Sequence, residues 1–103
     1  MEISFRTSKL KKQYENHRLA ERAYGAQVAR RYIQRINIIK KARDIGELCD
    51  PAMSPGLRCH PLKADREGQW AVNLTGFYRL IFTLQGEQLE VACIEEVSKH
   101  YDD

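Results

Sequence analysis

Residues 57–82 read LRCHPLKADREGQWAVNLTGFYRLIF, and this stretch decides the expected fold. Apolar residues alternate along 70–74 and again along 78–84, and the Thr75-Gly76 pair between them is typical of a turn. The stretch therefore predicts two antiparallel strands joined by a short connection. It also places basic side chains beside the predicted strands, where they can meet one phosphate: His60, Lys63, Arg66 and Arg79.

The first residues of the chain predict a strand and a helix. Apolar and polar residues alternate over residues 2–6, as they do in a half-buried strand. Ser8 is then expected to cap a helix that runs from about Lys9 to His17.

A second, longer helix is expected from about Leu19 to Ile45, with Gly46 as its stop. Its apolar positions step by three or four and form one stripe: Tyr24, Val28, Tyr32, Ile36 and Ile39. The prolines at 51 and 55 indicate an irregular linker between Gly46 and Gly56. Beyond the turn at 85–87, alternation at 89, 91 and 93 predicts the last strand.

A strand, two helices and then a run of strands is the order of an α+β domain. We expect an N-terminal strand and two helices packed on a mainly antiparallel sheet. A chain of 103 residues is long enough for one modest hydrophobic core, so residues 1–103 are expected to form a single domain.

Charge is divided unevenly along the chain, although the net charge is only +3. Residues 1–43 hold 12 Lys/Arg against 3 Asp/Glu, and residues 44–103 hold 5 against 11. This division indicates a basic face made by the first half, which is either an ordinary solvated surface or a surface that attracts polyanions.

Three cysteines, Cys49, Cys59 and Cys93, form no Cys-x-x-Cys pair and are odd in number. We expect three reduced thiols rather than a disulfide framework or a zinc site. No cluster of acids and histidines has metal-ligand spacing, so neither a metal nor another cofactor is expected. The sequence Met1-Glu2-Ile3-Ser4-Phe5-Arg6 does not resemble a secretory signal and no apolar run is long enough to span a membrane, so a cytoplasmic protein without membrane contact is expected.

The segment His60-Pro-Leu-Lys-Ala-Asp-Arg66, the following Gly68-Gln-Trp70 and the pair Tyr78-Arg79 resemble the RelE/ParE superfamily of bacterial toxins. The similarity is to its HigB-like plasmid killer branch, in which glycine stands at the position of Ala64. Ile94-Glu-Glu-Val97 and the later His100 follow in the family's order, so the resemblance covers nearly all of the chain. It implies a RelE-like fold with a concave, basic sheet face.

The resemblance implies the toxin of a type II toxin–antitoxin system involved in plasmid maintenance. Such a toxin is an mRNA interferase, a ribosome-dependent endoribonuclease that inhibits translation. Its implied partners are the ribosome, mRNA and a HigA-like helix-turn-helix antitoxin, with DNA contacted only through that antitoxin. Two alternatives stay open: a non-enzymatic ParE-type inhibitor of DNA gyrase, and a decayed toxin that only binds its antitoxin.

Cleavage of RNA without metal needs a base for the ribose 2′-hydroxyl, an acid for the leaving 5′-oxygen and fixed positive charge at the phosphate. Histidine serves the first two roles because its ordinary pKa lies near neutrality. The predicted catalytic residues are His60, Lys63, Arg79 and His100, and the predicted RNA-binding residues are Arg58, Arg66, Lys99 and Tyr101.

The alternative for Arg79 is a structural salt bridge to Asp65 or Glu95. Ser98 and Lys99 stand where the HigB-like pattern has Asp and Tyr, which is a departure from the family's ending.

Overall fold

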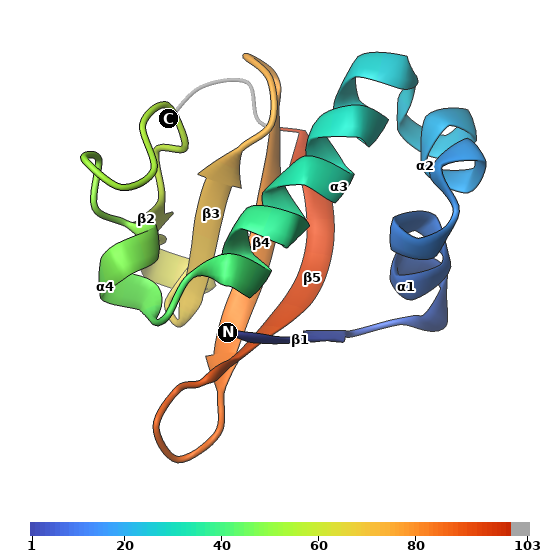
Figure 1. The fold of residues 1–103 in the computed structure, drawn as a ribbon. Helices are drawn as coiled ribbons and strands as arrows, with labels where there is room; N and C mark the ends of the chain where they lie inside the picture. Colours follow the sequence, from blue (N-terminus) through green and yellow to red (C-terminus); the bar gives the residue numbers. More distant parts are fainter. Residues whose placement is uncertain (100–103) are drawn as a thin grey trace.

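A computed structural model describes residues 1–99 and shows helices packed on one face of a five-stranded sheet (Figure 1). The helices and the short 3-10 turn η1 are α1 Ser8–Glu15, α2 His17–Tyr24, α3 Ala26–Lys41, α4 Ile45–Leu48 and η1 Ala64–Arg66. The strands are β1 Glu2–Phe5, β2 His60–Pro61, β3 Gln69–Asn73, β4 Tyr78–Gln85 and β5 Val91–Lys99. The prediction of a mixed α+β fold is confirmed.

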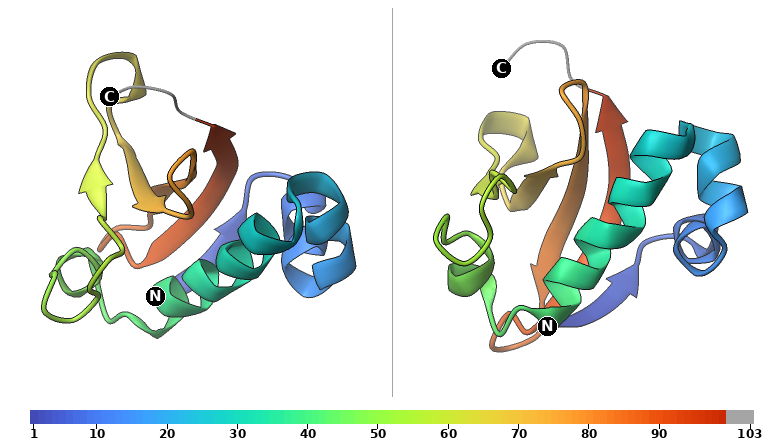
Figure 2. Two further views of the ribbon diagram at one scale, coloured as in Figure 1. Left: turned by 90° about the horizontal axis from the view of Figure 1, so that it is seen from above. Right: turned by 45° about the horizontal axis from the view of Figure 1, so that its top comes forward.

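The sheet has the strand order β1-β5-β4-β3-β2. β1 runs parallel to β5, and the other neighbours are antiparallel. The sheet curves, and α1, α2 and α3 all lie on its convex side, as the view from above shows (Figure 2). α1, α2 and α3 do not cover the opposite, concave side of the sheet, which is the open face; Ala71 and Ile81 on this side are nevertheless buried.

The core lies between α3 and the sheet. Most of the predicted apolar stripe of α3 is buried, and Tyr32, Ile36 and Ile39 have no exposed surface. They pack in one cluster with Leu80 and Phe82 of β4. Each large apolar side chain buried in this way contributes about 1.5–3 kcal/mol, so this contact fixes which face of β4 points toward the helix.

The single helix expected from Leu19 to Ile45 is wrong, because Gly25 divides it into α2 and α3. Gly25 has φ 86° and ψ 164°, a conformation that essentially only glycine adopts without strain. Its N–H donates to the carbonyl of Glu21 and its own carbonyl accepts from Ala29, so it ends one helix and begins the next.

The predicted caps are also corrected. Thr7, not Ser8, caps α1, because its hydroxyl accepts from the N–H of Leu10. The helix stop expected at Gly46 is wrong, since α3 ends at Lys41 and Gly46 lies within α4.

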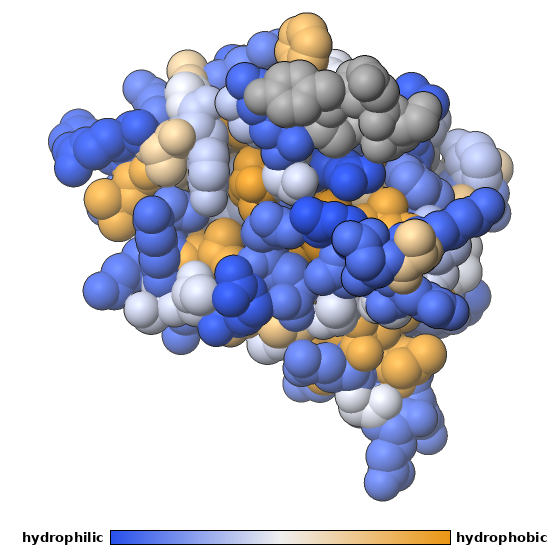
Figure 3. Space-filling view, turned by 180° about the vertical axis from the view of Figure 1, so that it is seen from behind, coloured by the Kyte–Doolittle hydropathy of each residue, from blue (hydrophilic) through white to orange (hydrophobic). Residues whose placement is uncertain are grey.

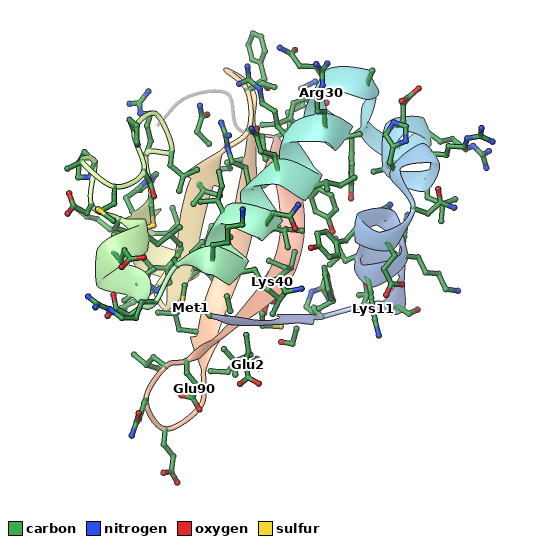
Figure 4. All side chains as sticks on the ribbon, viewed as in Figure 1. Met1, Glu2, Lys11, Arg30, Lys40 and Glu90 are labelled. Atoms are coloured by element: carbon green, nitrogen blue, oxygen red, sulfur yellow. A yellow bond between two sulfur atoms is a disulfide. The ribbon has the colours of Figure 1, made fainter. Side chains whose placement is uncertain are left out.

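The N-terminal ammonium group provides an unexpected C-terminal cap for α3. The nitrogen of Met1 donates to the carbonyls of Ile39, Lys40 and Ala42. Met1 and Lys40 are labelled near this end of α3 in Figure 4. A cation at this position interacts favourably with the negative end of the helix dipole.

β5 begins at Val91 rather than at Leu89, and it continues through the expected Ile94–Val97 end to Lys99. Ile81 pairs with Glu96 whereas Phe82 pairs with Ile94, so β5 has a bulge at this point. The extra residue places both Glu95 and Glu96 on the open face, where they bond to Thr83 and Arg66 respectively.

The expectation of three reduced thiols is wrong for two of them. Cys49 and Cys59 form a disulfide, while Cys93 is free and buried. The sequence spacing of Cys49 and Cys59 does not reveal that they pair, because the pairing depends on the path of the chain between α4 and β2. The bond closes the loop directly before His60.

Replacing Gly25 with Ala tests the backbone strain alone, because an added Cβ at this position would meet no atom within 4 Å. We expect Gly25→Ala to lower the free energy of unfolding by about 1–3 kcal/mol. Gly76→Ala is the control: its Cβ also meets nothing, and its φ is not in the positive region. Urea denaturation of both variants measures the difference, and an equal loss in the two would contradict the role of Gly25.

Reduction of the disulfide should destabilise the protein. Closure of a loop with a separation of 10 residues stabilises the folded state by about 2–3 kcal/mol in the chain-entropy model. Urea denaturation with and without reductant measures this effect. The double variant Cys49→Ser/Cys59→Ser should show no dependence on reductant, and a wild-type protein that shows none either would contradict the prediction.

Candidate active site

The strand register brings residues from four strands into one row on the open face. His60 on β2 pairs with Ala71, which pairs with Ile81, which pairs with Glu96 on β5. Residues directly opposite each other on paired strands share a face of the sheet. His60 and Glu96 therefore lie at opposite ends of this row.

Arg79 lies in the next row on the same face. It pairs with Asn73 on β3 and Ser98 on β5. Because side chains alternate along a strand, Arg79 and Ile81 point to the face opposite Leu80. Strand spacing puts the backbones of His60 and Arg79 about 10 Å apart across the sheet and about 7 Å apart along it.

His60 is exposed, and its ring orientation is fixed by one hydrogen bond. Its Nδ1 lies 2.8 Å from the carbonyl oxygen of Arg58. A carbonyl only accepts, so Nδ1 carries the hydrogen and the neutral ring has its lone pair on Nε2. Arg58 supports this geometry with a left-handed backbone, φ 54°. Nε2 is thus the atom suited to receive a proton.

Arg79 is half-buried, with its Nε atom shielded from solvent. Burial of this kind restricts the guanidinium to a fixed direction, as a pre-positioned charge requires. Glu95, one of the two acids considered as a structural partner of Arg79, accepts from Thr83 Oγ1 at 2.8 Å, and its other carboxylate oxygen lies 3.5 Å from Arg6 Nε.

Arg66 is engaged in an ion pair that the sequence did not indicate. Its Nη1 donates to Glu96 at 2.8 Å and to Gln69 at 3.0 Å. The pair offsets the charge of Glu96 on a face expected to be basic. A strand pattern without the bulge places only one of the two glutamates on this face, so their joint position was not foreseen.

Of the other predicted residues, Lys63 and Arg58 lie beside β2 of this face, whereas Lys99 pairs with Tyr78 and so points to the helix side of the sheet. Lys63 is exposed and immediately precedes η1, in the connection between β2 and β3. Arg58 is exposed in the disulfide-closed loop. Lys99 is the last residue of β5, with Nζ 5.9 Å from the centre of the Tyr78 ring. His100 and Tyr101 lie outside the described residues.

The open face is mainly hydrophilic, with apolar residues visible in the recesses between polar ones (Figure 3). Among residues 1–99, no group of three or more His, Cys, Asp or Glu side chains is arranged to hold a metal ion. Within the same range, no helix combines the length and apolar character that a membrane span needs.

Comparison with solved structures shows that the fold is shared with known toxins. The YoeB/ParE toxin from Agrobacterium tumefaciens matches with a TM-score of 0.57 and 18% identity, covering 98% of this chain and 100% of that one. The YoeB–YefM complex from Staphylococcus aureus matches with a TM-score of 0.61 and 14% identity, covering 98% of both chains. No protein-family model and no curated protein matches the sequence.

The hydrogen bond of His60 predicts its neutral tautomer. In the neutral ring we expect Nδ1 to carry the hydrogen and Nε2 to carry none. Long-range ¹H–¹⁵N NMR spectra distinguish the two nitrogens. The opposite tautomer would mean that the Arg58 carbonyl does not orient the ring in solution.

Proposed function

We propose that this chain is a metal-independent endoribonuclease and the toxin of a type II toxin–antitoxin system. The observation that carries the proposal is the position of His60 and Arg79 in adjacent rows of one open sheet face. The fold shared with YoeB/ParE-type toxins supports it. The motif from His60 to Arg79 favours the HigB-like branch, whose members cleave mRNA on the ribosome.

The proposed reaction begins with attack of the ribose 2′-hydroxyl on the adjacent phosphorus. His60 accepts the hydroxyl proton at Nε2 as the new O–P bond forms. The bond to the 5′-oxygen then breaks, leaving a 2′,3′-cyclic phosphate and a 5′-hydroxyl. A second group donates a proton to the leaving 5′-oxygen, and the candidates for this role are Lys63 and His100.

Arg79 stabilises the charge that grows on the phosphoryl oxygens. A guanidinium held in place before the reaction pays no reorganisation when that charge develops. Arg58, Arg66, Lys99 and Tyr101 are the proposed RNA-binding residues. Arg66 already bonds to Glu96 and Gln69 through Nη1, so only its other N–H donors can bind a phosphate.

Dependence on the ribosome agrees with the openness of the face. His60 and Lys63 are both exposed, so an RNA strand is not enclosed by the protein itself. Positioning of substrate and catalytic groups supplies a large part of the rate in such reactions. The ribosome is the proposed source of that positioning, and the cytoplasm is accordingly the proposed location.

The proposed partner is a helix-turn-helix antitoxin of the HigA kind, through which DNA is contacted indirectly. The basic half of the chain offers an acidic segment of such a partner an electrostatic target. The structural neighbour from Staphylococcus aureus is likewise found in a complex, with YefM.

Substitution of the two central residues tests the proposal. His60→Gln and Arg79→Ala should each lower transcript cleavage by about two to three orders of magnitude, by analogy with the loss of one pre-positioned donor. The losses of cleavage rate should be far from additive in the double variant, because the two residues act on one phosphate. Cleavage is measured by mapping new transcript 5′ ends after induction in bacteria.

Matched controls separate chemistry from surface charge. His17→Gln removes an exposed histidine on α2 that pairs with Glu21, and Arg43→Ala removes an exposed arginine after α3. Both should cleave as the wild type does. Growth inhibition without any new 5′ ends would instead favour the ParE-type inhibitor, and cleavage by the double variant at the wild-type rate would end the nuclease proposal.

A further inference from the structure

The connection between β3 and β4 presents an aromatic ring to solvent. Leu74 and Thr75 both donate their N–H groups to the carbonyl of Tyr78, which closes a tight turn. Phe77 lies in this turn with 64% of its surface exposed. An exposed aromatic ring on a closed turn offers a flat face on which an unpaired base can stack.

Two arginines of α3 donate hydrogen bonds to the residues that lead into this turn. Arg31 donates from Nη1 to the carbonyl of Leu74 at 2.8 Å, and Arg35 donates from Nε to the carbonyl of Asn73 at 2.9 Å. Arg35 also donates from Nη1 to Gln34. A guanidinium has five N–H donors, so each arginine keeps donors for a further acceptor.

The two guanidinium groups lie close enough to affect each other. Burial, and secondarily the charge of Arg31, lowers the pKa of Arg35. Within residues 1–99 the ion pairs to carboxylates are made by other cations, and neither of these arginines takes part in one. Two adjacent positive charges without a carboxylate favour a bound anion. Arg30 extends from the same end of α3 (Figure 4).

Arg31 and Arg35 reach the end of β3 from the helix side of the sheet, and Arg79 lies near the same end on the opposite, open face. Asn73, whose carbonyl accepts from Arg35, is the strand partner of Arg79. Phe77 lies two residues before Arg79 in the chain. A polymer bound at Arg79 therefore reaches the turn within a short distance.

We infer that Arg31, Arg35 and Phe77 bind the single-stranded RNA next to the phosphate that is cleaved. Phe77 stacks on an unpaired base, and the two arginines bind backbone phosphates. Aromatic platforms combined with cationic groups are the usual means of binding unpaired nucleotides, because every base has a stacking face and every nucleotide a phosphate. That the bound strand is the substrate rests on the proposed function.

The decisive measurement is the affinity of purified variants for a short fluorescent single-stranded RNA with 2′-O-methyl groups, which cannot be cleaved. Phe77→Ala should weaken binding by about 5- to 150-fold, the loss expected for one stacked base. Phe77→Tyr should retain affinity. Leu89→Ala is the matched control, since Leu89 is a comparably exposed apolar residue on the β4–β5 turn and its loss should change nothing.

The arginines are tested through the salt dependence of binding. Arg31→Gln should reduce the slope of log K against log salt by about 0.7, the contribution of one phosphate contact in a single strand. Arg43→Gln, with the same charge change at an exposed site after α3, should leave the slope unchanged. Urea denaturation of Arg31→Gln separates loss of the phosphate contact from loosening of the turn.

The results distinguish this inference from the proposed function. Wild-type RNA affinity in both Phe77→Ala and Arg31→Gln overturns the inference, even if His60→Gln abolishes cleavage. Failure of the wild-type protein to bind the RNA overturns it as well. If Phe77→Ala weakens RNA binding while His60→Gln cleaves normally, the RNA-binding inference is supported and the catalytic role of His60 is contradicted.

Discussion

The site depends on the register of β4 against its neighbours. Leu80 and Phe82 are buried against α3, and this burial turns Arg79 toward the open face. A slip of one residue in β4 would exchange the two faces, placing the guanidinium in the core and apolar side chains on the open face. One constraint, the register of β4, thus sets both the apolar contact that stabilises the fold and the direction of the residue that would bind phosphate. The direction of Arg79 on the open face therefore depends on the apolar packing on the helix side of the sheet.

Much of the fold was predictable, because it follows from local periodicity. Alternation along residues 70–74 and 78–84 predicts the strand pair, and its phase alone assigns Arg79 to the side opposite Leu80. The stripe along α3 likewise predicts the side that packs on the sheet. These patterns are strong because each is repeated over several turns or residue pairs of one element.

The features that were missed depend on single residues or on contacts between distant segments. Gly25 interrupts a pattern that otherwise continues, and only its positive φ separates α2 from α3. The pairing of Cys49 with Cys59 depends on the path of a loop, and the bulge that brings Glu95 and Glu96 to one face depends on the β4–β5 register. The exposure of Phe77 was not foreseen for a related reason, because a residue in a turn takes part in no periodic pattern.

The position of β5 has a consequence for the order of events during synthesis. β5 is the last strand in the chain, yet it lies between β1, the first, and β4. Until it has been made, β1 has no strand beside it, β4 is an unpaired edge, and one side of the row that contains Arg79 is missing. Pairings so distant in sequence form late, because the whole intervening chain must be ordered to close them. A nascent polypeptide therefore cannot form the complete open face until β5 has left the ribosome.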